Sequence, residues 1–185
     1  MSFKREAFLY NLFHCDKNYL READRLLKSF PKTKTILEIG AGTGLMTKEL
    51  QARGCEVVGI EPSPQMLRYW VADKNTRVYL TAVEKIDRDF FESGQFDLVI
   101  AAYDILNYVK PKDYWSARAK LGYWGKNVYT EEWDNGPVPL IRTKMVDGIK
   151  RIRFGLKLGK TVHLWYIYPS IACVEKHTLF IHGEG

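Results

Sequence analysis

Apolar positions along the chain follow helical spacing in some stretches and strand spacing in others. Between Tyr19 and Phe30 they recur every three or four residues, which predicts a helix that ends before Pro31. Short apolar runs typical of buried strands occupy residues 35–39, 56–60, 78–80, 96–101 and 127–131. Helices are expected between these runs, over residues 45–53, from Pro64 onward and over 113–123. Strands that alternate with helices predict parallel βαβ units.

Two short signals mark helix boundaries within this region. Gly54 follows the helix predicted over 45–53, where a left-handed C-cap belongs. Ser63 and Pro64 are the residue types preferred at the N-cap and at the first helical position.

The pattern changes after residue 136, where apolar and polar residues begin to alternate. Alternating stretches cover residues 149–156 and 162–168, Gly159 and Lys160 offer a turn between them, and residues 179–181 form a further short apolar run. We therefore expect a Rossmann-like α/β fold that carries an antiparallel β meander at its C-terminal end. One domain over 1–185 is expected, with an N-terminal helical segment (1–34), an α/β core (35–135) and an antiparallel tail (136–185).

Length and composition narrow the class of protein. A chain of 185 residues fits one domain with a single substantial core. The first residues are charged without a following apolar core, and the longest apolar run, Leu98–Tyr103, is far shorter than the roughly 20 residues that span a bilayer. We expect a soluble cytoplasmic protein, without a membrane partner. The three cysteines form no metal-binding spacing, so no metal site is predicted, and Cys55 is expected in the core.

A cluster of basic residues stands out in the tail. It is opposed only by Asp147 and consists of Arg142, Lys144, Lys150, Arg151, Arg153, Lys157 and Lys160. Such a cluster can attract an acidic substrate or nucleic acid. The favoured interpretation is the solvated face of an alternating strand.

Three glycines at alternate positions carry the strongest chemical signal. Gly40, Gly42 and Gly44 follow a strand and open a helix, where glycine lets the backbone turn tightly and approach a ligand. Their GxGxG spacing departs from the GxGxxG of dinucleotide sites, and Leu45 occupies the position where those sites need a small residue. Glu61 ends the second strand about 20 residues later, where a carboxylate can accept hydrogen bonds from ribose hydroxyls. The combination predicts a nucleoside site without a bound pyrophosphate.

These residues together resemble motifs I and II of the class I S-adenosylmethionine-dependent methyltransferases. The first is Glu38-Ile39-Gly40-Ala41-Gly42-Thr43-Gly44 and the second is the run that ends in Gly59-Ile60-Glu61. The resemblance implies S-adenosylmethionine as cofactor. It implies cofactor contacts at Glu38, Gly40, Gly42, Gly44, Glu61, Pro62, Met66, Ala82, Val83 and Ala101.

Two of these positions carry alternatives. Met66 matches the apolar residue that packs on the adenine in the family, and a core methionine on an amphipathic helix fits it nearly as well. The family has an acidic residue after the third strand, which binds the adenine amino group, whereas this chain has Ala82 there. The backbone at Ala82 and Val83, or the side chain of Glu84, is expected to replace it.

Two further segments point to a small-molecule enzyme within the family. Residues 104–108 resemble the D-S-L-N-Y segment of small-molecule methyltransferases. The N-terminal run around Tyr10 and Tyr19 is similar to a helix of amino-sugar N-methyltransferases and glycine N-methyltransferase-like proteins, in which tyrosines close over the cofactor. Family members continue with another helix and two strands after the tail, so the chain resembles a short form or a fragment.

The expected reaction is methyl transfer to nitrogen or oxygen of a small molecule. Because ligands bind at the carboxyl ends of parallel strands, Asp104, Tyr103 and Asn107 are the candidate catalytic residues. Asp104 could take a proton from the acceptor or act as an N-cap. Trp165, Tyr166 and Tyr168 are expected to wall the acceptor site, or else to complete the core or a dimer interface.

Two other functions stay open. The basic tail is compatible with a nucleic-acid methyltransferase, although no Asn/Asp-Pro-Pro-Tyr signature follows the fourth strand. A non-catalytic module that binds S-adenosylmethionine is the other. Monomer and homodimer remain equally open.

Overall fold

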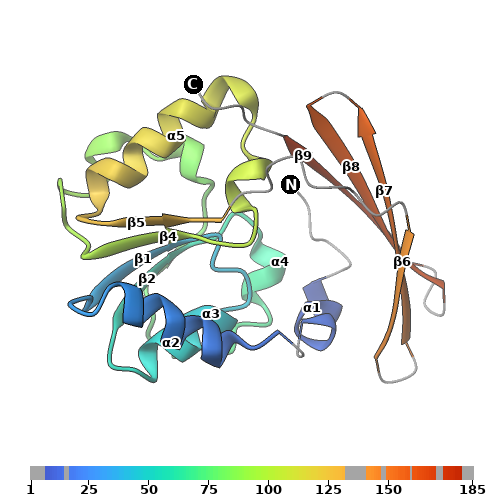
Figure 1. The fold of residues 1–185 in the computed structure, drawn as a ribbon, viewed down its shortest axis with the longest axis horizontal. Coiled ribbons are helices and arrows are strands. Elements are labelled where there is room, and N and C mark those ends of the chain that lie inside the picture. Colours follow the sequence, from blue (N-terminus) through green and yellow to red (C-terminus); the bar gives the residue numbers. More distant parts are fainter. Residues whose placement is uncertain are drawn as a thin grey trace.

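A five-stranded parallel sheet forms the centre of the molecule (Figure 1). The computed structural model describes residues 7–14, 17–131, 141–146, 149–158, 160–169 and 173–180. The strand order is β3-β2-β1-β4-β5, and every neighbouring pair is parallel. The strands are β1 (Thr35–Ile39), β2 (Glu56–Ile60), β3 (Val78–Tyr79), β4 (Leu98–Ala101) and β5 (Val128–Thr130). The Rossmann-like α/β fold predicted from the sequence is confirmed.

Helices cover both faces of this sheet, as Figure 1 shows. One face carries α2 (Tyr19–Ser29) and α3 (Leu45–Gln51), and the other carries α5 (Pro111–Trp124). Shorter helices lie near the strand ends: α1 (Ala7–Phe13), α4 (Pro64–Leu67), and the 3₁₀ turns η1 (Val83–Lys85), η2 (Arg88–Phe90) and η3 (Ile105–Tyr108). None of the described helices is both long and apolar enough to cross a membrane.

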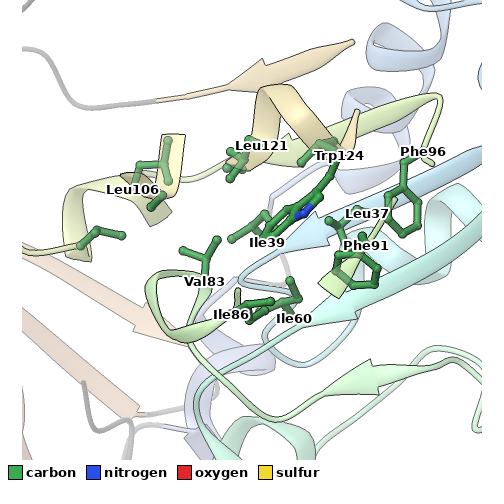
Figure 2. Packing of buried hydrophobic residues seen from close by; sticks show 14 of the residues in the cluster. Leu37, Ile39, Ile60, Val83, Ile86, Phe91, Phe96, Leu106, Leu121 and Trp124 are labelled. Carbon is green, nitrogen blue, oxygen red and sulfur yellow. The ribbon is translucent and has the colours of Figure 1, made fainter. Parts of the chain in front are cut away.

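The continuous apolar runs of the strands follow from burial on both faces. Ile36, Leu98 and Ile100 join a cluster beneath α2 and α3, whereas Leu37 and Val99 join a second cluster beneath α5. Successive residues of a strand point to opposite faces, so a sheet covered on both sides needs apolar residues at nearly every position. Figure 2 shows the second cluster, in which Leu121 and Trp124 of α5 pack toward the sheet. The predicted core position of Cys55 is confirmed in the first cluster.

The start of α4 agrees with its predicted capping residues, whereas α3 ends at Gln51, two residues before the predicted end at residue 53. The Ser63 hydroxyl accepts a hydrogen bond from the Met66 amide at 3.4 Å, and Pro64 begins α4. Gly54 has a left-handed φ of +82° after α3, as its C-cap position required.

A four-stranded antiparallel sheet follows the parallel one and stands beside it in Figure 1. Its strands are β6 (Ile141–Val146), β7 (Ile149–Leu158), β8 (Thr161–Tyr168) and β9 (Cys173–Phe180), paired in chain order. The antiparallel meander is confirmed, but the prediction of three strands was wrong. The prediction missed β6, and it began the last strand at residue 179, whereas β9 begins at Cys173.

Candidate active site

A cavity opens at the carboxyl edge of the parallel sheet, and it encloses about 740 Å³ including its open mouth. Its walls come from α1 and from the segments that follow β1, β2, β3 and β4. They are Tyr10, Ile39, Gly40, Gly42, Ile60, Glu61, Pro62, Met66, Ala82, Val83, Glu84, Ile105, Tyr108 and Val109. This is the edge where open α/β sheets bind their ligands, beside the point at which the strand order reverses.

The glycine loop forms the floor of the cavity. Gly40, Gly42 and Gly44 have φ angles of +74°, +60° and +81°, which are left-handed values that side chains rarely adopt. A Cβ atom on Gly40 would lie 2.5 Å from Cδ1 of Ile105, so the absence of a side chain there lets η3 approach the loop. A Cβ atom on Gly42 would meet Cε of Met66 at 3.5 Å and the Gly40 carbonyl oxygen at 3.9 Å, both ordinary contact distances. The loop therefore leaves a path for a ligand along its backbone.

Glu61 ends β2 with its carboxylate buried against this loop. One carboxylate oxygen accepts a hydrogen bond from the Gly42 amide and the other from the Ser63 amide, both at 2.8 Å. Burial raises the pKa of Glu61, and these two hydrogen bonds oppose the rise. Because a carboxylate has about four acceptor positions, each oxygen keeps one for a ligand. Glu61 can thus hold the loop and bind a pair of hydroxyl groups at once.

Helix α1 places Tyr10 on the opposite wall of the cavity. The Tyr10 and Tyr19 hydroxyls share a hydrogen bond, and burial raises the pKa of Tyr10 well above its usual value. The neighbouring Asn11 fastens α1 to the glycine loop, because its side-chain oxygen accepts a hydrogen bond from the Thr43 hydroxyl at 2.5 Å. Tyr10 therefore lies where the sequence predicts it, and Tyr19 supports it from behind.

The turn between β4 and η3 shapes the third wall. Tyr103 and Asp104 are non-glycine residues with left-handed φ angles of +63° and +60°. Each such residue costs about 1–3 kcal/mol of conformational energy, which the surrounding contacts must offset. The turn sends the chain back across the sheet edge, so that Ile105 and Tyr108 line the cavity.

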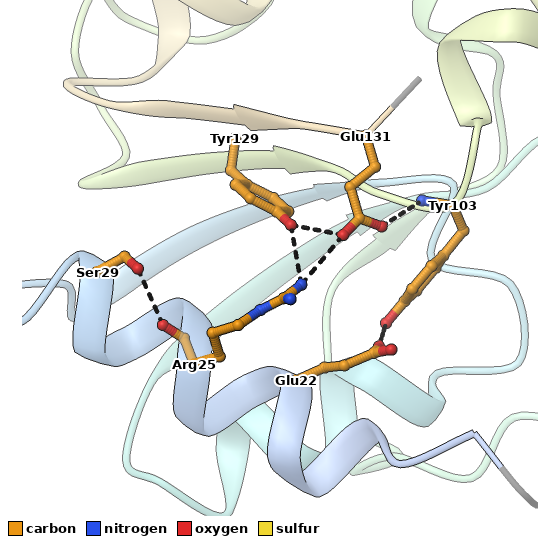
Figure 3. Close-up of polar contacts among 6 residues, drawn as sticks. All are labelled: Glu22, Arg25, Ser29, Tyr103, Tyr129 and Glu131. Carbon is orange, nitrogen blue, oxygen red and sulfur yellow. Dashed lines mark hydrogen bonds and ion pairs between the residues drawn. The ribbon is translucent and has the colours of Figure 1, made fainter. Parts of the chain in front are cut away.

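A network of polar contacts holds Tyr103 in this conformation (Figure 3). Its hydroxyl donates to the Glu22 carboxylate on α2, and its amide donates to a Glu131 carboxylate oxygen at 3.3 Å. The Lys17 ammonium lies 2.9 Å from the centre of its ring, and burial lowers the pKa of that lysine. Glu131 also accepts a hydrogen bond from the Tyr129 hydroxyl at 2.5 Å.

The predicted catalytic role of Tyr103 does not agree with this geometry. Its side chain points toward α2 and lines a second cavity, away from the glycine loop. Tyr103 and Asp104 have consecutive left-handed φ angles, a feature that no local sequence signal announces.

Asn107 and Asp104 are also absent from the walls of the first cavity, as far as the structure describes them. The Asn107 side-chain amide donates to the Phe180 carbonyl of β9 at 2.7 Å, and the residue is buried. Asn107 thus ties the antiparallel sheet to η3. Asp104 occupies the N-cap position of η3, as the alternative predicted, although its side chain makes no capping hydrogen bond.

Four predicted cofactor contacts lie outside the cavity wall. Glu38 is buried beneath the loop, where it accepts a hydrogen bond from the Thr47 hydroxyl at 2.5 Å. Gly44 packs against the Trp70 ring, Ala101 is buried under α5, and Tyr19 lies behind Tyr10. The other eight predicted contacts line the cavity.

Sequence reasoning missed several apolar residues of the wall. Ile39 and Ile60 are the last residues of their strands, a position that could have identified them. Ile105 and Val109 carry no such signal, because the turn at Tyr103 determines where they lie. The side chains of Trp165, Tyr166 and Tyr168, expected to wall the acceptor site, fall outside the described residues.

Comparison with known proteins identifies the region that carries this site. Residues 36–122 match the family described as a methyltransferase domain. This region therefore resembles a methyltransferase domain. The match begins within β1, extends into α5, and includes the glycine loop, Glu61 and η3. It confirms the family inferred from the two motifs.

Relatives of the methyltransferase domain agree with this assignment. An uncharacterized methyltransferase of Alkaliphilus oremlandii is 41% identical over 75 residues, which are 39% of this chain and 32% of the relative. Curated relatives of this kind match over only about a third of their own length, between 32% and 38%.

Solved structures resemble the chain over nearly its whole length. DesVI of Streptomyces venezuelae has a TM-score of 0.77 at 18% identity, over 96% of this chain and 84% of DesVI. CalS10 of Micromonospora echinaspora, an amino pentose methyltransferase with S-adenosylmethionine bound, has a TM-score of 0.74 at 16% identity, over 96% and 83% of the two chains. At such identities the likeness establishes the fold, antiparallel sheet included.

Proposed function

We propose that this chain binds S-adenosylmethionine in the cavity and transfers its methyl group to nitrogen or oxygen of a small-molecule acceptor. The observation that carries the proposal is the junction of the glycine loop with Glu61. Left-handed glycines open a backbone path, and a buried carboxylate with free acceptor positions lies directly beside it. A nucleoside needs both features, one for close approach and one for its ribose hydroxyls.

The remaining walls suit the other parts of the cofactor. Met66, Val83 and Ile105 give an apolar surface for a flat base. At this wall Ala82 replaces the acidic residue of the family, so the η1 backbone and Glu84 supply the polar groups for the base. Tyr10 and Tyr108 lie on the wall formed by α1 and η3, where they can exclude water from the reacting groups.

S-adenosylmethionine supplies an activated methyl group, so the protein mainly has to align the acceptor and keep the site dry. Such positioning is worth about 7–11 kcal/mol in well-oriented systems. The structural likeness to an amino pentose methyltransferase favours an amino sugar as acceptor. An ammonium acceptor must lose a proton before it attacks, and Asp104 is the acidic residue that we assign to this step.

Isothermal titration with S-adenosylmethionine and S-adenosylhomocysteine tests the cofactor site. We expect both to bind, and Glu61→Ala to weaken binding by about 1.5–3 kcal/mol, the usual value for hydrogen bonds to a charged group. Glu56→Ala is the matched control, because Glu56 is an exposed glutamate at the other end of β2. Unchanged affinity in folded Glu61→Ala would remove Glu61 from the site.

A screen of amino sugars and other small amines and alcohols then tests catalysis. Asp104→Asn should reduce turnover while preserving cofactor affinity, since asparagine tolerates the left-handed φ of this position. Binding without turnover of any acceptor would favour the non-catalytic module. Turnover of oligonucleotides alone would favour the nucleic-acid alternative.

A further inference from the structure

The side chain of Lys120 makes an unusual set of contacts with the η1 segment. From α5 its ammonium donates to the carbonyls of Val83, Glu84 and Ile86, at 3.4, 3.2 and 2.6 Å. An ammonium group has three N–H donors, so all three are used on one short stretch of backbone. Hydrogen bonds from a charged donor are also about twice as strong as neutral ones.

The same stretch of backbone is a wall of the proposed cofactor cavity. Ala82, Val83 and Glu84 line the cavity, whereas Lys120 does not. The turn makes two backbone hydrogen bonds of its own: the Lys85 amide donates to the Ala82 carbonyl at 3.0 Å and the Ile86 amide to the Val83 carbonyl at 3.4 Å. Lys120 therefore contributes more hydrogen bonds to η1 than η1 makes within itself.

The backbone of Lys120 lies in a well-packed part of α5. Its neighbours on α5, Ala117 and Leu121, are fully buried. Leu121 belongs to the same hydrophobic cluster as Val83 and Ile86 (Figure 2). A side chain anchored at this point can transmit the position of α5 to η1. Lys120 is half-buried, so solvent competes only partly for its ammonium group.

We propose that Lys120 is a positioning residue that sets the η1 backbone for recognition of the adenine base. The inference rests on the proposed function and adds a residue to it. With alanine at position 82, discrimination of the base depends on main-chain groups and on Glu84, and both depend on where η1 is held. Lys120 acts from behind the wall, without contact to the cofactor.

The test compares ligands that differ only in the base. S-adenosylhomocysteine carries the 6-amino group, and S-inosylhomocysteine carries an oxygen in its place. Lys120→Met keeps the apolar stem and removes all three donors, and Lys120→Arg keeps the charge and donors. Lys126→Met is the matched control, because that ammonium is bonded to Asp97 at 2.8 Å, outside the cavity wall.

We expect Lys120→Met to weaken S-adenosylhomocysteine binding about tenfold, the effect of losing well-placed hydrogen bonds, and S-inosylhomocysteine binding less than about twofold. The preference for adenine then falls about fivefold. Lys120→Arg should keep part of that preference, and Lys126→Met all of it. An unchanged preference in Lys120→Met would overturn the proposal, even if thermal stability fell, because a purely structural role weakens both ligands alike.

The proposal can still be tested if Lys120→Met does not fold or if the wild-type chain binds neither ligand. If Lys120→Met does not fold, Lys120→Gln retains two donors and should show a smaller fall in preference, and no fall would overturn the inference. If the wild-type chain binds neither ligand, the proposed function fails by itself. Amide exchange at Lys85 and Ile86 then still tests the contact, and equal exchange in wild type and Lys120→Met would contradict it.

Discussion

The carboxyl group of Glu38 lies between β1 and α3 with the Thr47 hydroxyl as its hydrogen-bond donor. Burial raises its pKa from 4.5 to about 8. The folded protein thus retains a proton that the unfolded chain releases above about pH 4.5. The contribution of Glu38 to the free energy of unfolding is therefore fully present below pH 4.5 and is lost as the pH rises toward 8.

Glu38→Gln is predicted to remove this pH dependence, since an amide oxygen can still accept the Thr47 hydroxyl. The melting temperature of the wild type should fall relative to Glu38→Gln between pH 5 and pH 8, with a difference in stability on the order of a few kcal/mol at pH 8. Melting curves recorded at half-unit pH intervals give the comparison. Parallel curves for the two proteins would show that Glu38 is ionised in the folded state at every pH tested.

At the residue scale, the sequence predicted positions whose chemistry is local. Gly40, Gly42 and Glu61 were identifiable because close backbone approach and a carboxylate at a strand end each require a particular residue type. The placement of Tyr103 toward α2 could not be predicted, because it depends on contacts with Glu22 and Glu131, which are distant in the sequence. A tyrosine after a parallel strand gives no indication of such partners.

At the element scale, the turn from β4 into η3 is held by contacts outside itself. Tyr103→Phe keeps the ring beside Lys17 and removes the hydroxyl that donates to Glu22. We expect a stability loss near the lower end of about 1.5–3 kcal/mol, because solvent can reach the half-buried Glu22 carboxylate once the hydroxyl is gone. Amide exchange at Leu106 to Val109 should accelerate, and S-adenosylhomocysteine should bind severalfold more weakly.

Tyr129→Phe is the matched comparison for this prediction. Its hydroxyl also donates to a carboxylate, that of Glu131, but Tyr129 lies in the regular backbone of β5. Equal effects of the two substitutions on ligand affinity would mean that the turn at Tyr103 does not position η3.

The boundaries of the buried central strands were predicted more accurately than those of the antiparallel sheet. Strands β1 and β2 were predicted with correct boundaries, because each is a short, mostly apolar run closed by glycine or a polar residue. Strand β9 was found only at its end, because Glu175, Lys176 and His177 interrupt its alternation. The strand pairs through backbone hydrogen bonds, which polar residues make as well as apolar ones, so the pattern alone could not reveal the strand.

At the scale of the whole molecule, Asn107 joins the two sheets. Asn107→Leu removes the donor and leaves the Phe180 carbonyl without this hydrogen bond, at a cost of about 1–3 kcal/mol if the carbonyl stays buried. We expect faster amide exchange in β9 and a higher KM for the acceptor, with cofactor affinity within about twofold, since Asn107 does not line the cavity. Asn127→Leu provides the control, because its amide makes the same kind of bond to the Asp97 carbonyl at 3.0 Å. A loss of cofactor affinity as large as the loss of acceptor affinity would show that the antiparallel sheet is not specific to the acceptor.

The cavity walls come from segments between Tyr10 and Val109, and β1 pairs with β4 only after β2 and β3 have been made. During synthesis the nascent chain therefore has no complete cofactor site until η3 has left the ribosome. Contacts so far apart in sequence also form late in refolding. Recovery of ligand binding should lag behind recovery of helix content. A ligand that binds only the complete site stabilises the folded state relative to partly folded ones.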